Sequence, residues 1–284
     1  MSGFDRVIVA DWSAASALSP KRPSANAIWL GVTDANGTQS QYFRSRASAE
    51  AFLSSAIEHQ TGRTLIGFDF PMGYPVGFAA RLTGTAHARA VWRWLAAHLD
   101  DGPDNANTRF ETAARMNGLI GGGLGPFWAR PHSLALDDLP ETKAVDYAAL
   151  DLAERRQVET LVRRAQPVWK LYTTGAAGGQ GLVGQAMIHR LCQRPGVAVW
   201  PFDAADRPVV LAEIYPSLLG QSVAADPAPI KDETQVRLLS RALWRLSQNG
   251  TLPALMATPP APVTTEEGWI LGAGHGPALE AALQ

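Results

Sequence analysis

Three short runs of uncharged residues, rich in Val, Ile and Leu, each end in a carboxylate. The runs are VIVA before Asp11, LIGF before Asp69 and VVLA before Glu213. Runs of this length and composition are typical of buried strands. A carboxylate at the end of such a strand is costly to bury alone, but several can share a divalent cation if their strands are neighbours. The sequence therefore predicts a sheet whose strand ends bring three acidic side chains together.

The first seventy residues predict a meander of three strands, followed by a helix and a fourth strand. The Asn36-Gly37 pair favours a tight hairpin between the second and third strands, because both residues tolerate a positive φ. The expected helix places several apolar residues on one face. The elements are strands ending at Asp11 and Asp69, strands over 27–32 and 39–44, and a helix over 47–59.

The rest of the chain predicts a helical region followed by two more strands and two helices. Residues 71–196 are expected to form a helical, glycine-rich insertion that packs over the edge of the sheet carrying the carboxylates. No low-complexity linker separates this region, so we expect one α/β domain over residues 1–284. The elements are helices over 86–98, 109–117, 150–164, 183–193 and 232–248, a last helix from about 277, and strands over 197–200 and 209–214.

Charge and cysteine content narrow the classes of function. The formal net charge of -1 gives no basic field for gripping long duplex DNA, because phosphate neutralisation dominates that kind of affinity. A small or local phosphate substrate is compatible with this balance. The single cysteine excludes an intramolecular disulfide and a zinc site with several cysteines. With no apolar run of membrane-spanning length and no signal peptide, we expect a soluble, cytoplasmic protein without a membrane partner.

Asp11, Asp69 and Glu213 are candidate ligands for Mg²⁺ or Mn²⁺, and Asp232 is a candidate fourth ligand. Carboxylate oxygens suit both ions, and two-metal phosphoryl chemistry requires several acidic groups around the cations. Each residue also has an alternative role. An Asp after a strand can start a turn, and Asp232 with Gln235 three residues later matches a helix-capping box.

A glycine-rich segment over 173–184 precedes one of the expected helices. Such a segment can offer backbone N–H groups to a phosphate, although this one lacks the Gly-Lys-Ser/Thr ending of a P-loop. Two interpretations stay open, a flexible connector and a loop that contacts phosphate. No pair of histidines has His-x-x-x-His spacing and no Gly-x-Ser-x-Gly motif is present, which disfavours a zinc hydrolase and an α/β-hydrolase.

Several of these motifs together resemble one protein family. They are Asp11 after the first strand, DFPMG at 69–73, GGQGLVGQ at 178–185, EIYP at 213–216 and Asp232 at a helix start. The chain in these respects resembles an uncharacterised bacterial and archaeal family of predicted nucleases with Asp-x-Pro-x-Gly and Glu-x-x-Pro motifs. It differs in having Trp12 and Ser13 where glycines often follow the first Asp.

The resemblance implies a ribonuclease H-like mixed sheet flanked by helices, with the carboxylates gathered at its centre. It also implies a metal-dependent phosphodiester hydrolase that acts on nucleic acid or a nucleotide. In that activity Asp11, Asp69, Glu213 and Asp232 would be the catalytic residues and would bind the metal, Mg²⁺ or Mn²⁺. A shared fold does not fix a function.

Two other classes of function are open. One is a non-catalytic nucleotide-binding or accessory protein, linked through the resemblance to molybdopterin guanine dinucleotide biosynthesis. In that protein the carboxylates would be structural or would hold one weakly bound ion. The other class is an actin-like kinase, which also has an Asp after its first strand, but the glycine-bearing phosphate hairpin expected after Asp11 is absent.

Overall fold

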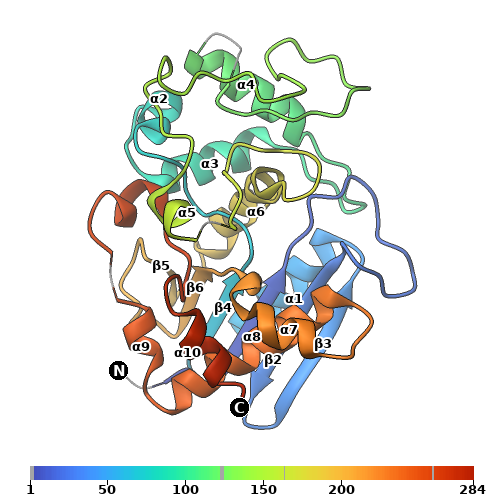
Figure 1. The fold of residues 1–284 in the computed structure, drawn as a ribbon, viewed down its shortest axis with the longest axis vertical. Coiled ribbons are helices and arrows are strands. Elements are labelled where there is room, and N and C mark those ends of the chain that lie inside the picture. Colours follow the sequence, from blue (N-terminus) through green and yellow to red (C-terminus); the bar gives the residue numbers. More distant parts are fainter. Residues whose placement is uncertain (1–2, 122–124, 163, 258) are drawn as a thin grey trace.

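A six-stranded mixed sheet forms the centre of the protein (Figure 1). The computed structural model describes residues 3–121, 125–162, 164–257 and 259–284. The strands are β1 (Arg6–Asp11), β2 (Ile28–Asp34), β3 (Gly37–Phe43), β4 (Thr64–Phe68), β5 (Val197–Trp200) and β6 (Val209–Glu213), in the order β3-β2-β1-β4-β6-β5. β2 is antiparallel to both of its neighbours, and β1, β4, β6 and β5 are parallel. The α/β class and all six expected strands are confirmed.

The register of the parallel strands brings the strand-end carboxylates to one edge of the sheet. Ala10 of β1 pairs with Phe68 of β4, and Phe68 pairs with Glu213 of β6. Asp11 and Asp69 are the next residues on their strands, and the Asp69 N–H donates to the Ala10 carbonyl at 3.2 Å. The prediction that these three strands are neighbours and end at the same edge is therefore confirmed.

Helices occupy both faces of this sheet. They are α1 (Arg46–Glu58), α2 (Phe78–Thr83), α3 (Ala88–His98), α4 (Arg109–Gly121), α5 (Gln157–Leu161), α6 (Ala177–Leu191), α7 (Gly220–Ala225), α8 (Lys231–Gln248), α9 (Leu252–Leu255) and α10 (Gly276–Ala281). Within the described ranges, none of these helices has both the length and the apolar character needed to cross a membrane.

Two hydrophobic clusters lie on opposite faces of the sheet, because side chains alternate along each strand. Ile8 belongs to the cluster that includes Leu53 of α1 and Trp92 of α3. Val7 belongs to the other cluster, with Leu243 of α8. The helix expected over 232–248 is therefore present as α8, with one apolar face buried on the sheet as its spacing indicates.

Helix α8 approaches β2 more closely than a side chain between them would allow. A Cβ atom at Gly31 would overlap the backbone oxygen of Val236. The missing side chain lets the helix backbone rest directly on the strand. The first turn of α8 carries Lys231 and Asp232, both of which line a cavity at the edge of the sheet where Asp11 lies.

The chain between β4 and β5 holds α2 to α6, which occupy the upper half of the view in Figure 1. The helix expected over 150–164 is wrong for residues 150–156, 162 and 164, which are not helical. Asp151 has a positive φ of 46° and Arg156 is extended, so α5 begins only at residue 157. Position 163 of that expected helix lies outside the described residues.

The glycine-rich segment is helical from residue 177, so the flexible-connector interpretation is wrong for residues 177–184. Its glycines allow close packing. A Cβ at Gly178 would overlap the carbonyl of Val168, and a Cβ at Gly184 would lie 2.5 Å from the ring of Phe70. Helix α6 therefore packs directly against the segment that follows Asp69, and its glycines are explained by packing.

Candidate functional site

A cavity of about 830 Å³ opens at the edge of the sheet where β1, β4 and β6 end. The four acidic residues singled out in the sequence all line it, as do four basic side chains. These residues are Asp11, Asp69, Glu213, Asp232, Arg109, Arg156, Arg164 and Lys231. The structure therefore brings together all the predicted site residues around one space, although it gives them different partners.

Asp11 and Asp69, which both line this cavity, form a hydrogen-bonded carboxyl pair. The Trp12 N–H donates to Asp69 Oδ1 at 2.7 Å. Burial raises the pKa of Asp11 well above its usual range, and the negative charges of Asp69 and Asp232 raise it further. Burial also raises the pKa of Asp69 to about 7, although hydrogen bonds from Trp12 and Asp11 act in the opposite direction. Without a cation, the pair therefore holds a proton near neutral pH.

Asp232 lies in the first turn of α8 and faces the same pair. Its Oδ2 accepts a hydrogen bond of 2.6 Å from the Asn26 N–H. The N-cap residue of α8 is Ile230, which makes no side-chain capping bond, so Asp232 does not form the capping box that Gln235 made possible. Its negative charge contributes to the raised pKa values of both Asp11 and Asp69. Asp232 is thus a third carboxylate of the same cluster.

Glu213 is on the cavity wall, but a buried arginine engages both of its oxygens. Arg156 Nη2 donates to Glu213 Oε1 at 2.6 Å and Nη1 donates to Oε2 at 2.7 Å. The same guanidinium donates through Nε to Glu159 Oε1 at 2.9 Å. The Met72 N–H is a further donor to Glu213 Oε2, at 3.0 Å. Glu213 therefore fixes Arg156 and the chain after Asp69.

The donor chemistry of Asp11, Asp69 and Asp232 fits a hard divalent cation. All three supply carboxylate oxygens, and Lys231 is the basic group whose charge acts against the rise in the Asp11 pKa. Across the described ranges, no set of three or more His, Cys, Asp or Glu side chains is already arranged around a common ion position. Glu213 fits less well, because an ion would have to compete with Arg156 for its oxygens.

Sequence reasoning missed the basic residues of the cavity. Arg156 stands in a charged run, Glu154-Arg155-Arg156, that has the pattern of an exposed surface. Only the fold shows that it is 2% exposed and paired with a strand-end carboxylate 57 residues away. Lys231 could have been predicted to lie near the site, because it directly precedes Asp232 at a helix start.

Asp69→Asn is expected to remove a pH-dependent loss of stability. A carboxyl whose pKa is higher in the folded state binds more protons there, so the protein loses stability as pH rises from 3.8 towards about 7. The loss from this group is of the order of 4 kcal/mol, at about 1.4 kcal/mol per pKa unit. The amide variant retains an oxygen that can accept from the Trp12 N–H.

The measurement is urea unfolding of the wild type and the variant in EDTA at pH 4, 5.5 and 7.5. The stability of the variant relative to the wild type should increase with pH. Asp206→Asn, at a carboxyl that is 66% exposed, should follow the wild type. Parallel pH profiles for the wild type and Asp69→Asn would show that the Asp69 carboxyl is not perturbed.

Comparisons of the chain with protein-family models, curated proteins and solved structures find no match. The inference about function therefore depends on the cavity itself. Its distinguishing feature is a cluster of three carboxylates on the ends of two parallel strands and one helix, surrounded by basic side chains. Residues with perturbed pKa values in a concave site are typical of functional sites.

Proposed function

We propose that the protein is a metal-dependent phosphodiester hydrolase with a ribonuclease H-like fold, acting on a nucleotide or nucleic acid. The observation that carries the proposal is the shared cavity of Asp11, Asp69 and Asp232. The mixed sheet supports the fold, since its antiparallel β3-β2-β1 meander continues into the parallel strands β4 and β6. In that fold, residues 71–196 would be a helical insertion over the active edge.

Asp11, Asp69 and Asp232 would hold Mg²⁺ or Mn²⁺. A bound ion of this kind activates water for attack and stabilises charge on the leaving oxygen of a phosphate ester. Because the Asp11–Asp69 pair retains a proton in the metal-free protein, its carboxylates must lose that proton to become ligands. Metal affinity is therefore expected to rise with pH through about 7, the pKa of Asp69.

The basic residues of the cavity would bind the anionic part of the substrate. Lys231 adjoins the carboxylate cluster and can donate to a phosphate oxygen as a compact point charge. Glu213 is a positioning residue in this scheme, because it holds Arg156 against the cavity wall. The local basic groups also fit the near-neutral net charge, which favours a small phosphate ligand over nonspecific binding of long duplexes.

The test is hydrolysis of bis-p-nitrophenyl phosphate and of short single-stranded DNA and RNA by the purified wild-type protein. Turnover should require Mn²⁺ or Mg²⁺, stop in EDTA, and return when metal is restored. The rate at low metal concentration should increase between pH 6 and 8 as the carboxyl pair loses its proton. No metal-dependent hydrolysis of any of these diesters would refute the proposal.

A non-catalytic nucleotide-binding role is the second candidate. One observation favours it: the Arg156 guanidinium engages both oxygens of Glu213, which leaves three of the four predicted carboxylates for a cation. In this role the cavity would bind a nucleotide and release it unchanged. Calorimetry with nucleotides, combined with product analysis, separates the two, because binding without any hydrolysis supports only the second.

A further inference from the structure

Arg109, the first residue of α4, also lines the cavity that holds Asp11, Asp69 and Asp232. The residue is only 7% exposed. Its Nη1 donates to Ser16 Oγ at 2.7 Å and to Asn107 Oδ1 at 2.8 Å, both neutral acceptors. The side chain also lies over the ring of Phe110, 4.1 Å from the centroid.

In the described part of the chain no carboxylate contacts the guanidinium of Arg109 directly, although the more distant charges of Glu111 and Asp101 favour its protonated form. Within the described part of the chain it forms no salt bridge, and its buried Nε has no hydrogen-bond partner. Burial lowers the pKa of Arg109 to about 10, and the nearby charge of Arg46 contributes. A buried cation with no anion in direct contact is unfavourable. The arrangement is stabilised if an anion enters the cavity and accepts a hydrogen bond from Nη2, the terminal nitrogen that has no partner among the described residues.

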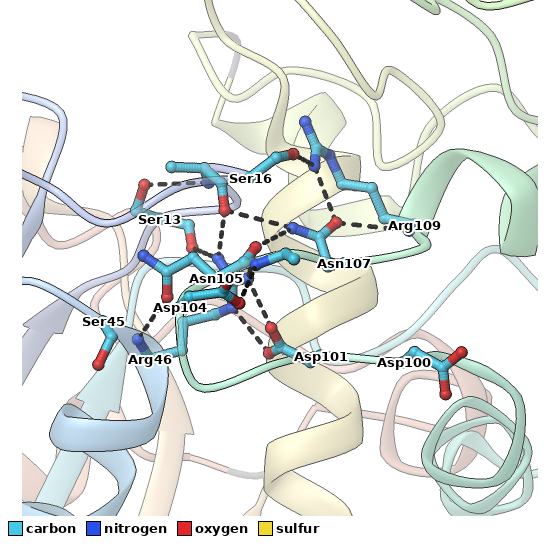
Figure 2. Close-up of polar contacts among 12 residues, drawn as sticks. Ser13, Ser16, Ser45, Arg46, Asp100, Asp101, Asp104, Asn105, Asn107 and Arg109 are labelled. Atoms are coloured by element: carbon cyan, nitrogen blue, oxygen red, sulfur yellow. Dashed lines mark hydrogen bonds and ion pairs between the residues drawn. The ribbon is translucent and has the colours of Figure 1, made fainter.

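A second buried arginine holds Arg109 in place through two loops (Figure 2). Arg46 donates through Nη1 to the carbonyls of Ser13 and Ala15, both at 2.8 Å, in the loop that follows Asp11. Its Nε and Nη2 are held by Asp101, at 2.7 and 2.6 Å. Asn107 Nδ2 donates to the Ala15 carbonyl at 3.2 Å. The loop that carries Ser16 and the loop that leads into Arg109 are thus joined in one network.

This network leaves one side of the Arg109 guanidinium free. Figure 2 shows Ser16 and Asn107 at one terminal nitrogen, while the other terminal nitrogen points away from the network. The free terminal nitrogen, Nη2, carries two N–H groups that can donate charge-assisted hydrogen bonds to phosphate oxygens. Rigid support from Ser16 and Asn107 reduces the entropy lost when the anion binds.

We propose that Arg109 is the residue that binds a phosphate group of the substrate in this cavity. The inference rests on the proposed function for the identity of the substrate, a nucleotide or another phosphate ester. Phosphate binding itself requires neither metal nor turnover. The phosphate can be terminal or part of a diester, since both present oxygens to the guanidinium.

The test is isothermal titration calorimetry at low ionic strength in EDTA, with adenosine 5′-monophosphate, the dinucleotide TpT and uncharged adenosine. Arg109→Gln should weaken binding of the phosphate-bearing ligand about tenfold or more, and Arg109→Lys should weaken it less. Binding of adenosine should not change between the wild type and these variants. The matched control is Arg115→Gln, at an exposed arginine of the same helix that does not line the cavity.

If Arg109→Gln weakens the binding of AMP but not of TpT, the site takes a terminal phosphate. If it weakens the binding of both ligands equally, the site also takes a diester. Wild-type affinity in Arg109→Gln, an equal loss in Arg115→Gln, or no binding of either phosphate ligand by the wild type would overturn the inference. Thermal melting of each variant distinguishes lost binding from lost folding. If Arg109 proves necessary for AMP binding but no diester is hydrolysed, the phosphate site stands and the hydrolase proposal fails.

Discussion

Asp11→Asn is expected to reduce metal-dependent phosphodiester hydrolysis by about a thousandfold, equivalent to about 4 kcal/mol of transition-state stabilisation. The substitution removes one anionic oxygen from the cluster that Asp69 and Asp232 complete. The folded protein should remain at least as stable as the wild type in EDTA. The amide can still donate a hydrogen bond to Asp69, as the protonated Asp11 carboxyl does, and it cannot ionise at this buried position.

The measurements are kcat/KM with Mn²⁺, Mn²⁺ affinity by calorimetry and the melting temperature in EDTA. Asp206→Asn, which makes the same chemical change at an exposed carboxyl, should leave all three unchanged. Loss of activity with unchanged Mn²⁺ affinity would assign Asp11 a role other than metal binding. Unchanged activity and unchanged affinity would exclude Asp11 from the site.

Arg156→Met is expected to destabilise the protein by about 3–5 kcal/mol at pH 7, the usual effect of removing one partner from a buried ion pair. Arg156 is the shared partner of two buried carboxylates, Glu159 and Glu213. Without it, both would lie in the interior with no counter-charge. Burial already raises the pKa of Glu159, even though Arg156 acts in the opposite direction.

Urea unfolding at pH 7 and pH 5 tests this expectation. The destabilisation should be smaller at pH 5, because a protonated carboxyl group has no charge to leave unpaired. Arg190→Met provides the control, since Arg190 pairs with Glu50 on the surface and is 47% exposed. That variant should lose less than about 1 kcal/mol. Equal losses of unfolding free energy in the two variants would show that the buried ion pairs of Arg156 contribute no more than a surface pair.

The strands, and the placement of a carboxylate at the end of each, were predictable because both depend on local composition. The runs before Asp11 and Asp69 contain no charged residue, and all of their residues are buried. Because β1, β4 and β6 are parallel neighbours in the sheet, Asp11, Asp69 and Glu213 come to one edge; this strand order is long-range information that local composition does not contain. The single-domain organisation stays a prediction.

Long-range partners were not predictable in the same way. The Arg156–Glu213 pair joins residues far apart in the chain, and neither residue's neighbours in sequence indicate the other. The glycines of α6 also mislead, because glycine is usual in loops. Here Gly178 and Gly184 lie in a helix whose neighbours leave no room for a side chain. In both cases the decisive interaction is with another segment.

The close contact between Gly31 and α8 determines how near the negative charge of Asp232 lies to Asp11 and Asp69. Asp232 precedes Val236, the residue resting on Gly31, by about one helical turn. A larger residue at position 31 would push α8 away from β2 and would move the carboxylate of Asp232 away from Asp11 and Asp69. A residue with no functional group of its own thereby governs how readily the two strand-end acids ionise.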